Sequence, residues 1–369
     1  IGDAMGASTE MWHRKDIQLS YGYITGLTPA LREQSPEGTW EHNLLAGATT
    51  DDTRWKYFMV KYLSAYGENP NPNDFAKFIT DYYGDLAETL SDSKIRTNPD
   101  LLDDQNEKID WIKEWARVAL AYQESPEAYQ KAQNRFYGGE MSCAGQLYTP
   151  MFGLVAVNPE EAYSVAYEHT LFDLGYAKDI SALVSAMTQM AMRTQNMDSI
   201  INTATFVDPY GYQDSRLVGR ISYATADASV KNILRIKQLV LIDSLVAKDT
   251  LIFKKPEGFP GNQKGWVRQE MAYKLLEKDE KAIAFHAGEI WQILVTGLQF
   301  GEGNFEKTMQ FIVNYGRDND TVAAVAGMIL GAKDGYSNLP KALREEVVRV
   351  SREQMGIDLE AMAQEIVNQ

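Results

Sequence analysis

Residues 316–321 read Gly316-Arg317-Asp318-Asn319-Asp320-Thr321 and run directly into an alanine-rich segment that ends near residue 332. A similar stretch, Ala48-Thr49-Thr50-Asp51-Asp52-Thr53, leads into an apolar-periodic segment near residue 54. Each stretch places two carboxylates and a threonine hydroxyl at the start of an expected helix. Asp and Thr are preferred N-caps, and acidic side chains suit the positive end of a helix. Taken alone, each cluster is typical of a helix cap.

The two clusters together indicate more than capping. If the fold brings them side by side, four carboxylates share one place, and protons or cations must offset their repulsion. Oxygen ligands without His or Cys favour Mg²⁺, Mn²⁺ or Ca²⁺ over zinc. Adjacent residues on a helix point about 100° apart, so Asp51 and Asp52 could serve two ions. The sequence by itself does not show that the two clusters meet.

Most of the chain predicts helices, because apolar residues recur every three or four positions. The predicted helices span residues 55–66, 74–90, 108–122, 159–171, 177–192, 226–246, 278–300, 304–315, 321–332, 341–355 and 358–367. No two alternating Val/Ile-rich runs are joined by a hairpin turn, so a sheet is not expected. Residues 12–49 are aromatic and loop-like, which fits either a functional loop or a surface flap. The connectors are too short for interdomain linkers, so we expect one all-α domain over residues 1–369.

Composition excludes several classes of partner. The chain has 369 residues and a net charge of −15, which argues against a nucleic-acid partner. No run of ~18 apolar residues is present, so no membrane span is predicted. No basic leader segment is visible, and we expect a cytoplasmic monomer. The only cysteine, Cys143, is more typical of a buried inert thiol than of a nucleophile.

Three motifs resemble those of the ADP-ribosylglycohydrolases, a family that includes the dinitrogenase-reductase-activating glycohydrolase. The first is residues 2–10, Gly2-Asp3-Ala4-Met5-Gly6-Ala7-Ser8-Thr9-Glu10, and the second is Thr50-Asp51-Asp52-Thr53. The third runs from Asn314 through Asp318 and Asp320 to Gly327. Their order and separation fit, so the resemblance covers essentially the whole chain. The third motif is the most specific, and the first is weak alone.

The resemblance implies an all-α orthogonal helical bundle with a binuclear Mg²⁺ or Mn²⁺ centre in a central cleft. It implies metal-ligand roles for one set of six side chains: Thr50, Asp51, Asp52, Asp318, Asp320 and Thr321. It also places Glu10 at the edge of the cleft as a candidate acid/base or ligand gate. The candidate catalytic residues are Glu10, Asp51, Asp52 and Asp318.

The segment expected to choose the substrate departs from the family's pattern. A Gly-Asn-Gly-Ala-Ala-Met-Arg stretch is common in the family, and this chain has Tyr137-Gly138-Gly139-Glu140-Met141-Ser142-Cys143 instead. The glycines still allow close approach of a phosphate or ribose, but the arginine is absent. The candidate substrate-binding residues are Gly138, Gly139, Glu140, Met141, Tyr176 and Arg317. Tyr176 or Phe172 could stack a base or serve as core, and Arg317 could contact an anion or pair with a neighbouring acid.

The reaction that the resemblance implies is hydrolysis at the anomeric carbon of an ADP-ribosyl or related ribosyl group. The substrate would be a small molecule or an ADP-ribosylated protein. One alternative is hydrolysis of a smaller ribosyl conjugate such as a nucleoside. Another is a catalytically silent, ligand-binding relative, as some lens crystallins resemble this family. Retention of six hard metal ligands argues against the silent relative.

Overall fold

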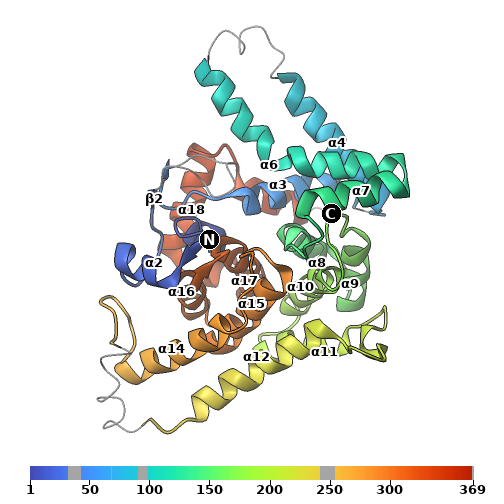
Figure 1. Ribbon diagram of the computed structural model, residues 1–369. Coiled ribbons are helices and arrows are strands. Elements are labelled where there is room, and N and C mark those ends of the chain that lie inside the picture. The colour runs from blue at the N-terminus through green and yellow to red at the C-terminus, as the bar shows by residue number, and fades with distance from the viewer. Residues whose placement is uncertain (32–42, 68, 90–98, 242–253, 368–369) are drawn as a thin grey trace.

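Helices make up most of the computed structural model, which describes residues 1–31, 43–67, 69–89, 99–241 and 254–367 (Figure 1). The first half contains α1 (Gly2–Gly6), α2 (Arg14–Tyr21), α3 (Asp51–Tyr66), α4 (Pro72–Thr89), α6 (Pro99–Glu124), α7 (Pro126–Tyr137), α8 (Phe152–Val155), α9 (Pro159–Glu168) and α10 (Ala177–Ala191). The second half contains α11 (Met197–Phe206), α12 (Ile221–Gln238), α14 (Gln263–Glu277), α15 (Ala287–Gly301), α16 (Phe305–Tyr315), α17 (Asn319–Asp334), α18 (Lys341–Glu353) and α19 (Leu359–Val367). Short 3-10 turns include η1 (Ala144–Leu147) and η2 (Thr149–Met151). None of the described helices is both long and apolar enough to cross a membrane.

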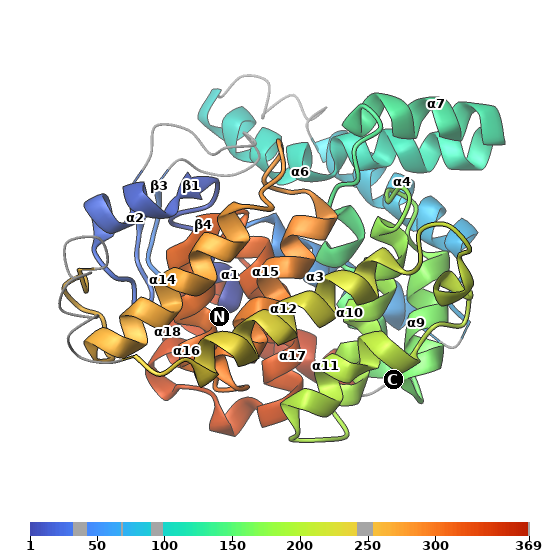
Figure 2. The same cartoon turned by 60° about the horizontal axis from the view of Figure 1, so that its bottom comes forward.

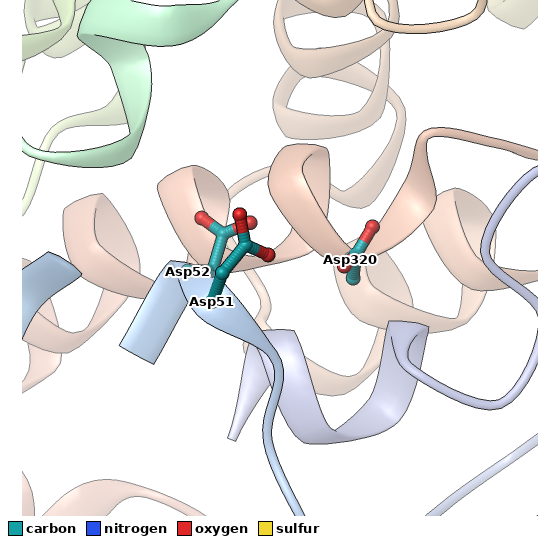
Figure 3. A group of neighbouring side chains, drawn as sticks. All are labelled: Asp51, Asp52 and Asp320. Carbon is teal, nitrogen blue, oxygen red and sulfur yellow. The ribbon is translucent and has the colours of Figure 1, made fainter. Parts of the chain in front are cut away.

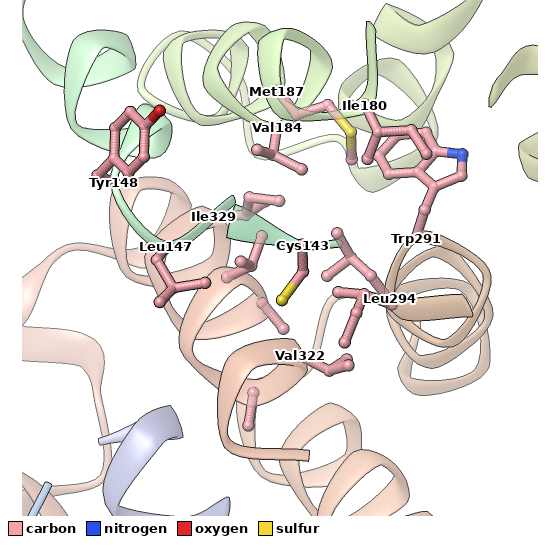
Figure 4. Close-up of a cluster of buried hydrophobic side chains, with 14 of the residues drawn as sticks. Cys143, Leu147, Tyr148, Ile180, Val184, Met187, Trp291, Leu294, Val322 and Ile329 are labelled. Carbon is pink, nitrogen blue, oxygen red and sulfur yellow. The ribbon is translucent and has the colours of Figure 1, made fainter. Parts of the chain in front are cut away.

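Helix α17 lies at the centre of the bundle and contacts α1, α10, α15 and α16 (Figure 2). Its alanines and valines are buried on nearly every side, which fits a helix enclosed by other helices. Val322 and Ile329 of α17 share one apolar cluster with Val184 of α10 and Leu294 of α15 (Figure 4). The first turn of α17, which carries the third sequence motif, is therefore held on a closely packed element.

Two short antiparallel strand pairs add to the helices. Strand β1 (Trp12–His13) pairs with β4 (Gly316–Arg317), and β2 (Ala30–Leu31) pairs with β3 (Asn43–Leu44). The first pair matters for the site, because it ties the end of the first motif to the start of the third. The Met11 amide donates to the Arg317 carbonyl at 2.7 Å. The expectation of an all-helical chain without a sheet is correct except for these two-residue pairs.

The predominantly helical fold is confirmed, but several helix predictions need correction. The predicted helix 278–300 is wrong over its first part, because α14 ends at Glu277 and α15 begins only at Ala287. The sequence analysis also gives no prediction for α7, α11 and α14, and it describes α2 as loop. Residues 242–246 of the predicted helix 226–246, and Trp40 of the aromatic segment, lie outside the described residues.

Candidate active site

The structure brings the two Asp/Thr helix starts together. Asp51 and Asp52 stand at the N-terminus of α3, and Asp320 lies in the first turn of α17 facing them (Figure 3). One ligand oxygen from each of the three carboxylates lies within 4.8 Å of the others. All three residues are buried. Buried like charges at this separation repel strongly unless a cation or proton neutralises them.

Asp3 of α1 holds the Thr50–Thr53 turn in place. Its Oδ1 accepts hydrogen bonds from the Thr50 amide and hydroxyl, both at 3.0 Å. Its Oδ2 accepts from the Thr53 amide at 3.0 Å and from the Thr53 hydroxyl at 2.5 Å. Because Asp3 satisfies these donors, Asp51 and Asp52 are not needed as their acceptors. Burial, with the charge of Asp52, raises the pKa of Asp3.

Asp52 links the two helix starts directly. Its Oδ2 accepts from the Thr321 hydroxyl at 3.0 Å, and its Oδ1 pairs with Lys56 at 2.8 Å. Thr321 is buried in α17, whereas Lys56 follows Asp52 by one turn of α3. Lys56 therefore offsets one negative charge of the cluster.

Asp318 and Asp320 form a coupled carboxyl pair. Asp318 is the N-cap of α17 but makes no capping hydrogen bond with its side chain. Its Oδ2 instead accepts from the Cys143 thiol, with Sγ 3.5 Å away, and its side chain lies close enough to Asp320 and Thr321 for both to affect its pKa. Burial, with the charge of Asp52, raises the pKa of Asp318 to about 6. Burial and the charges of Glu10 and Asp318 raise the pKa of Asp320 well above its usual range, so without a cation this pair holds a proton to a higher pH than ordinary carboxyl groups do.

Asp320 offers an oxygen with no visible structural use. Its Oδ1 is buried and has no hydrogen-bond partner among the described residues. A buried carboxylate oxygen without a partner is costly. A divalent cation would satisfy it, and the all-oxygen donor set fits Mg²⁺ or Mn²⁺ better than zinc.

These carboxylates open onto a cavity of about 190 Å³. The residues that line it are Glu10, Asp51, Trp111, Glu114, Trp115, Phe136, Tyr137, Cys143, Ala144, Leu147, Phe285, Asp318, Asp320 and Thr321. Glu10 reaches the cavity because the chain around it is pinned to the third motif. Asn319 donates to the Thr9 hydroxyl at 2.7 Å, next to the β1–β4 pair. Of the predicted metal and catalytic residues, Thr50 and Asp52 are not among those that line the cavity.

The predicted substrate-binding residues are more dispersed. Gly138, Gly139 and Glu140 are exposed, and none of them is among the residues that line the cavity. Tyr176 is half-buried, with its ring centre 6.3 Å from that of His286. Phe172 packs in the core, with its ring centre 4.5 Å from that of Trp115.

Arg317 pairs with a neighbouring acid in the structure, which is the second of the two roles expected for it. It pairs with Glu289, with Nε 2.5 Å from Oε1 and a second nitrogen 3.1 Å from Oε2. It also donates to the Lys281 carbonyl at 2.8 Å. These contacts direct its guanidinium toward the segment before α15, and Arg317 does not line the cavity.

Sequence reasoning missed the aromatic side of the cavity and the anchoring role of Asp3. Trp111 and Trp115 are four residues apart, which is indistinguishable from ordinary helix core spacing. Cys143 was expected to be a buried thiol and is buried, but its Sγ also lies 3.5 Å from Asp318 Oδ2. Asp3 lies between Gly2 and Gly6 of the first motif. That position was the sequence feature that could have indicated its role.

Asp173 supports the turn that carries Ala144 and Leu147. Its Oδ1 accepts from the Gly145 amide at 2.7 Å, and burial raises its pKa to about 6. A raised carboxyl pKa means that the native state binds the proton more tightly than the unfolded chain. The native state therefore loses stability as the pH rises from about 4 through about 6, by on the order of 2–3 kcal/mol.

Asp173→Asn should remove this loss, since the amide oxygen can still accept from Gly145. As the pH rises from about 4 to about 7, we expect the free energy of unfolding of the variant to increase relative to that of the wild type by on the order of 2 kcal/mol. Urea unfolding at both pH values measures this change. His169, whose pKa burial lowers to about 4, changes stability in the opposite direction but equally in both proteins. An identical difference between the two proteins at both pH values would refute this role of Asp173.

Comparison with known proteins agrees with the geometry. The model of the ADP-ribosylglycohydrolase family matches residues 1–369, the whole chain. No curated protein sequence matches the chain. A match over the full length, together with the buried carboxylates that the first, second and third motifs assemble, shows that the chain belongs to the ADP-ribosylglycohydrolase family.

Proposed function

We propose that this protein hydrolyses the glycosidic bond at the anomeric carbon of a ribosyl group with the help of two divalent cations, Mg²⁺ or Mn²⁺. Its family implies hydrolysis of ADP-ribosyl groups. The observation that supports metal dependence is the convergence of Asp51, Asp52 and Asp320 within 4.8 Å, with Asp320 Oδ1 lacking any other partner. Substrates would be small ribosyl conjugates or ADP-ribosylated proteins.

The proposed ligands are Thr50, Asp51, Asp52, Asp318, Asp320 and Thr321. All offer oxygen donors, as Mg²⁺ and Mn²⁺ prefer. When bound, the cations would orient ribose hydroxyls and increase the acidity of a water molecule. They would also offset the repulsion that keeps a proton on the Asp318–Asp320 pair in their absence.

The chain's own residues supply the remaining chemistry. Glu10 lines the cavity close enough to Asp320 to raise its pKa, and it is the proposed acceptor of the water's proton. Cleavage at an anomeric carbon passes through an oxocarbenium-like state with developing positive charge. Asp51 and Asp318, which face the same cavity, would stabilise that charge. The aromatic side chains that line the same cavity limit access of bulk water.

The test is release of ADP-ribose from an ADP-ribosylated arginine peptide, before and after chelation. We expect chelator to lower the rate at least about 100-fold and added Mg²⁺ or Mn²⁺ to restore it. Calorimetric titration of the chelated protein should show two bound ions. A rate that survives chelation would refute metal dependence. Metal binding without hydrolysis of any riboside would favour a silent, ligand-binding relative instead.

A further inference from the structure

Aromatic rings make up much of the cavity lining besides the carboxylates. They belong to Trp111 and Trp115 of α6, Phe136 and Tyr137 of α7, and Phe285 from the segment before α15. Four of the rings form a continuous series: Trp115 to Phe136 at 5.5 Å, Phe136 to Tyr137 at 4.1 Å and Tyr137 to Phe285 at 6.1 Å between centres. Helices α6 and α7 pack on each other and lie at the top of Figure 1. We call these five residues the aromatic wall.

The charge of the cavity is entirely negative among the described residues that line it. Five of these residues are acidic and none is Lys, Arg or His. Lys56 pairs with Asp52, and Arg317 pairs with Glu289, so neither cation is directed into the cavity. Two divalent ions and Lys56 would supply five positive charges against the six negative charges of the four aspartates, Glu10 and Glu114. The site would therefore keep a net negative charge.

Glu114 extends this negative charge to the aromatic wall. It lies on α6 between Trp111 and Trp115, three residues after the first and one before the second, and it also lines the cavity. Its side chain is 47% exposed and its Oε1 lies 2.9 Å from Arg117 of the same helix. An exposed pair of this kind contributes little, so Glu114 can turn from Arg117 to a positively charged ligand at small cost.

These features select against phosphate and in favour of a planar cation. A diphosphate would bring two negative charges into a cavity whose described lining residues include no basic side chain, and like-charge contact costs several kcal/mol. A flat cationic ring, in contrast, would stack on the aromatic wall through cation–π contacts and pair with Glu114. We propose that the preferred substrate is an N-riboside without a diphosphate, whose leaving group is a planar cationic ring of the pyridinium type. This inference rests on the proposed function and narrows its substrate class.

The reaction of such a substrate balances without a further reactant. The water oxygen forms a bond to the anomeric carbon, and the bond from that carbon to the ring nitrogen breaks. The nitrogen keeps the electron pair and leaves as a neutral ring, so it needs no proton from a general acid. The proton lost by the water passes to Glu10. The products are free ribose and the neutral heterocycle, and no group is oxidised or reduced.

The experiment compares four substrates on the metal-loaded enzyme. They are nicotinamide riboside, its 5′-monophosphate, the neutral riboside inosine, and an ADP-ribosylated arginine peptide. We expect kcat/KM for nicotinamide riboside to exceed that for its 5′-monophosphate about 100-fold. Binding is measured separately, by quenching of tryptophan fluorescence in the chelated protein. Saturable quenching by nicotinamide riboside is expected there, because Trp111 and Trp115 form part of the wall.

Variants test the aromatic wall itself. Glu114→Gln should raise Kd and KM for nicotinamide riboside about 3- to 10-fold and change KM for the neutral inosine much less. Glu124→Gln removes the same charge from the exposed end of α6 and should change neither, which makes it the matched control. Trp115→Leu should weaken binding of nicotinamide riboside further. Trp115→Phe should restore most of the binding if the aromatic ring is responsible for it.

Two outcomes separate this inference from the proposed function. Chelator-sensitive hydrolysis of the ADP-ribosylated peptide that equals or exceeds hydrolysis of nicotinamide riboside would overturn the inference and leave the proposed function intact. Failure to hydrolyse any of the four substrates would overturn both. An equal effect of Glu114→Gln on nicotinamide riboside and inosine would also contradict the charge argument.

Discussion

We expect Asp318→Asn to lower kcat/KM for ribosyl hydrolysis about 1,000-fold, which corresponds to the several kcal/mol that metal-assisted stabilisation of a transition state supplies. The substitution keeps the size of the side chain and removes one negative charge from the carboxyl pair that Asp318 forms with Asp320. The N-terminus of α17 should remain intact, because Asp318 makes no capping hydrogen bond with its side chain and Asn is itself a good N-cap. Steady-state kinetics with added Mn²⁺ measures the effect.

The same variant should separate metal binding from folding. Without metal, it should be at least as stable as the wild type, since a buried charge with a raised pKa has been removed. With metal at about 100 times Kd, the wild type should gain about 2.7 kcal/mol, and Asp318→Asn should gain less. Asp334→Asn, at the far end of α17, is the control and should behave like the wild type. Activity of Asp318→Asn within about threefold of the wild type would remove Asp318 from the metal site.

The sequence predicted the carboxylate half of the site because its signal is local. Asp51, Asp52 and Asp320 each stand at a helix start marked by cap residues, and the charge they would share if brought together was the reason to expect a metal. What the sequence could not show was their juxtaposition. That depends on α1, whose Asp3 binds the Thr50–Thr53 turn while its helix packs against α17.

The aromatic half of the site was not predictable in the same way. Helix α7 has a short apolar stripe, because Tyr129, Ala132 and Phe136 recur at helical spacing and pack against the core. The stripe is weak in the sequence, since no residue of the helix is completely buried. Its end signals were nonetheless present: Ser125 caps its start, Pro126 follows, and Gly138 ends it in the left-handed region at φ +62°. The start of α15 was predicted too early, at residue 278, for another reason. The cap of α15 is His286, whose Nδ1 accepts from the Gly288 amide, and histidine is not a usual N-cap.

Gly6→Ala should destabilise the protein by more than about 3 kcal/mol, because it forces two backbones apart. A Cβ at Gly6 would lie 2.4 Å from the Asp320 Cα and 2.6 Å from the Asp320 amide nitrogen. Neither atom can move without shifting the first turn of α17. The glycine of the first motif is therefore needed for close packing of α1 on the residue that presents Asp320, which explains why this motif accompanies the two Asp/Thr clusters.

Gly84→Ala is the matched control for Gly6→Ala, since it makes the same change at a helical site with nothing within 4 Å of the new methyl. It should raise stability by about 0.5–1 kcal/mol through the helix preference of alanine. Thermal unfolding with and without Mn²⁺ distinguishes Gly6→Ala from Asp318→Asn. Asp318→Asn should lose metal stabilisation but keep its stability without metal, whereas Gly6→Ala should lose both. If Gly6→Ala unfolds like the wild type and binds metal normally, the contact between α1 and α17 does not set the position of Asp320.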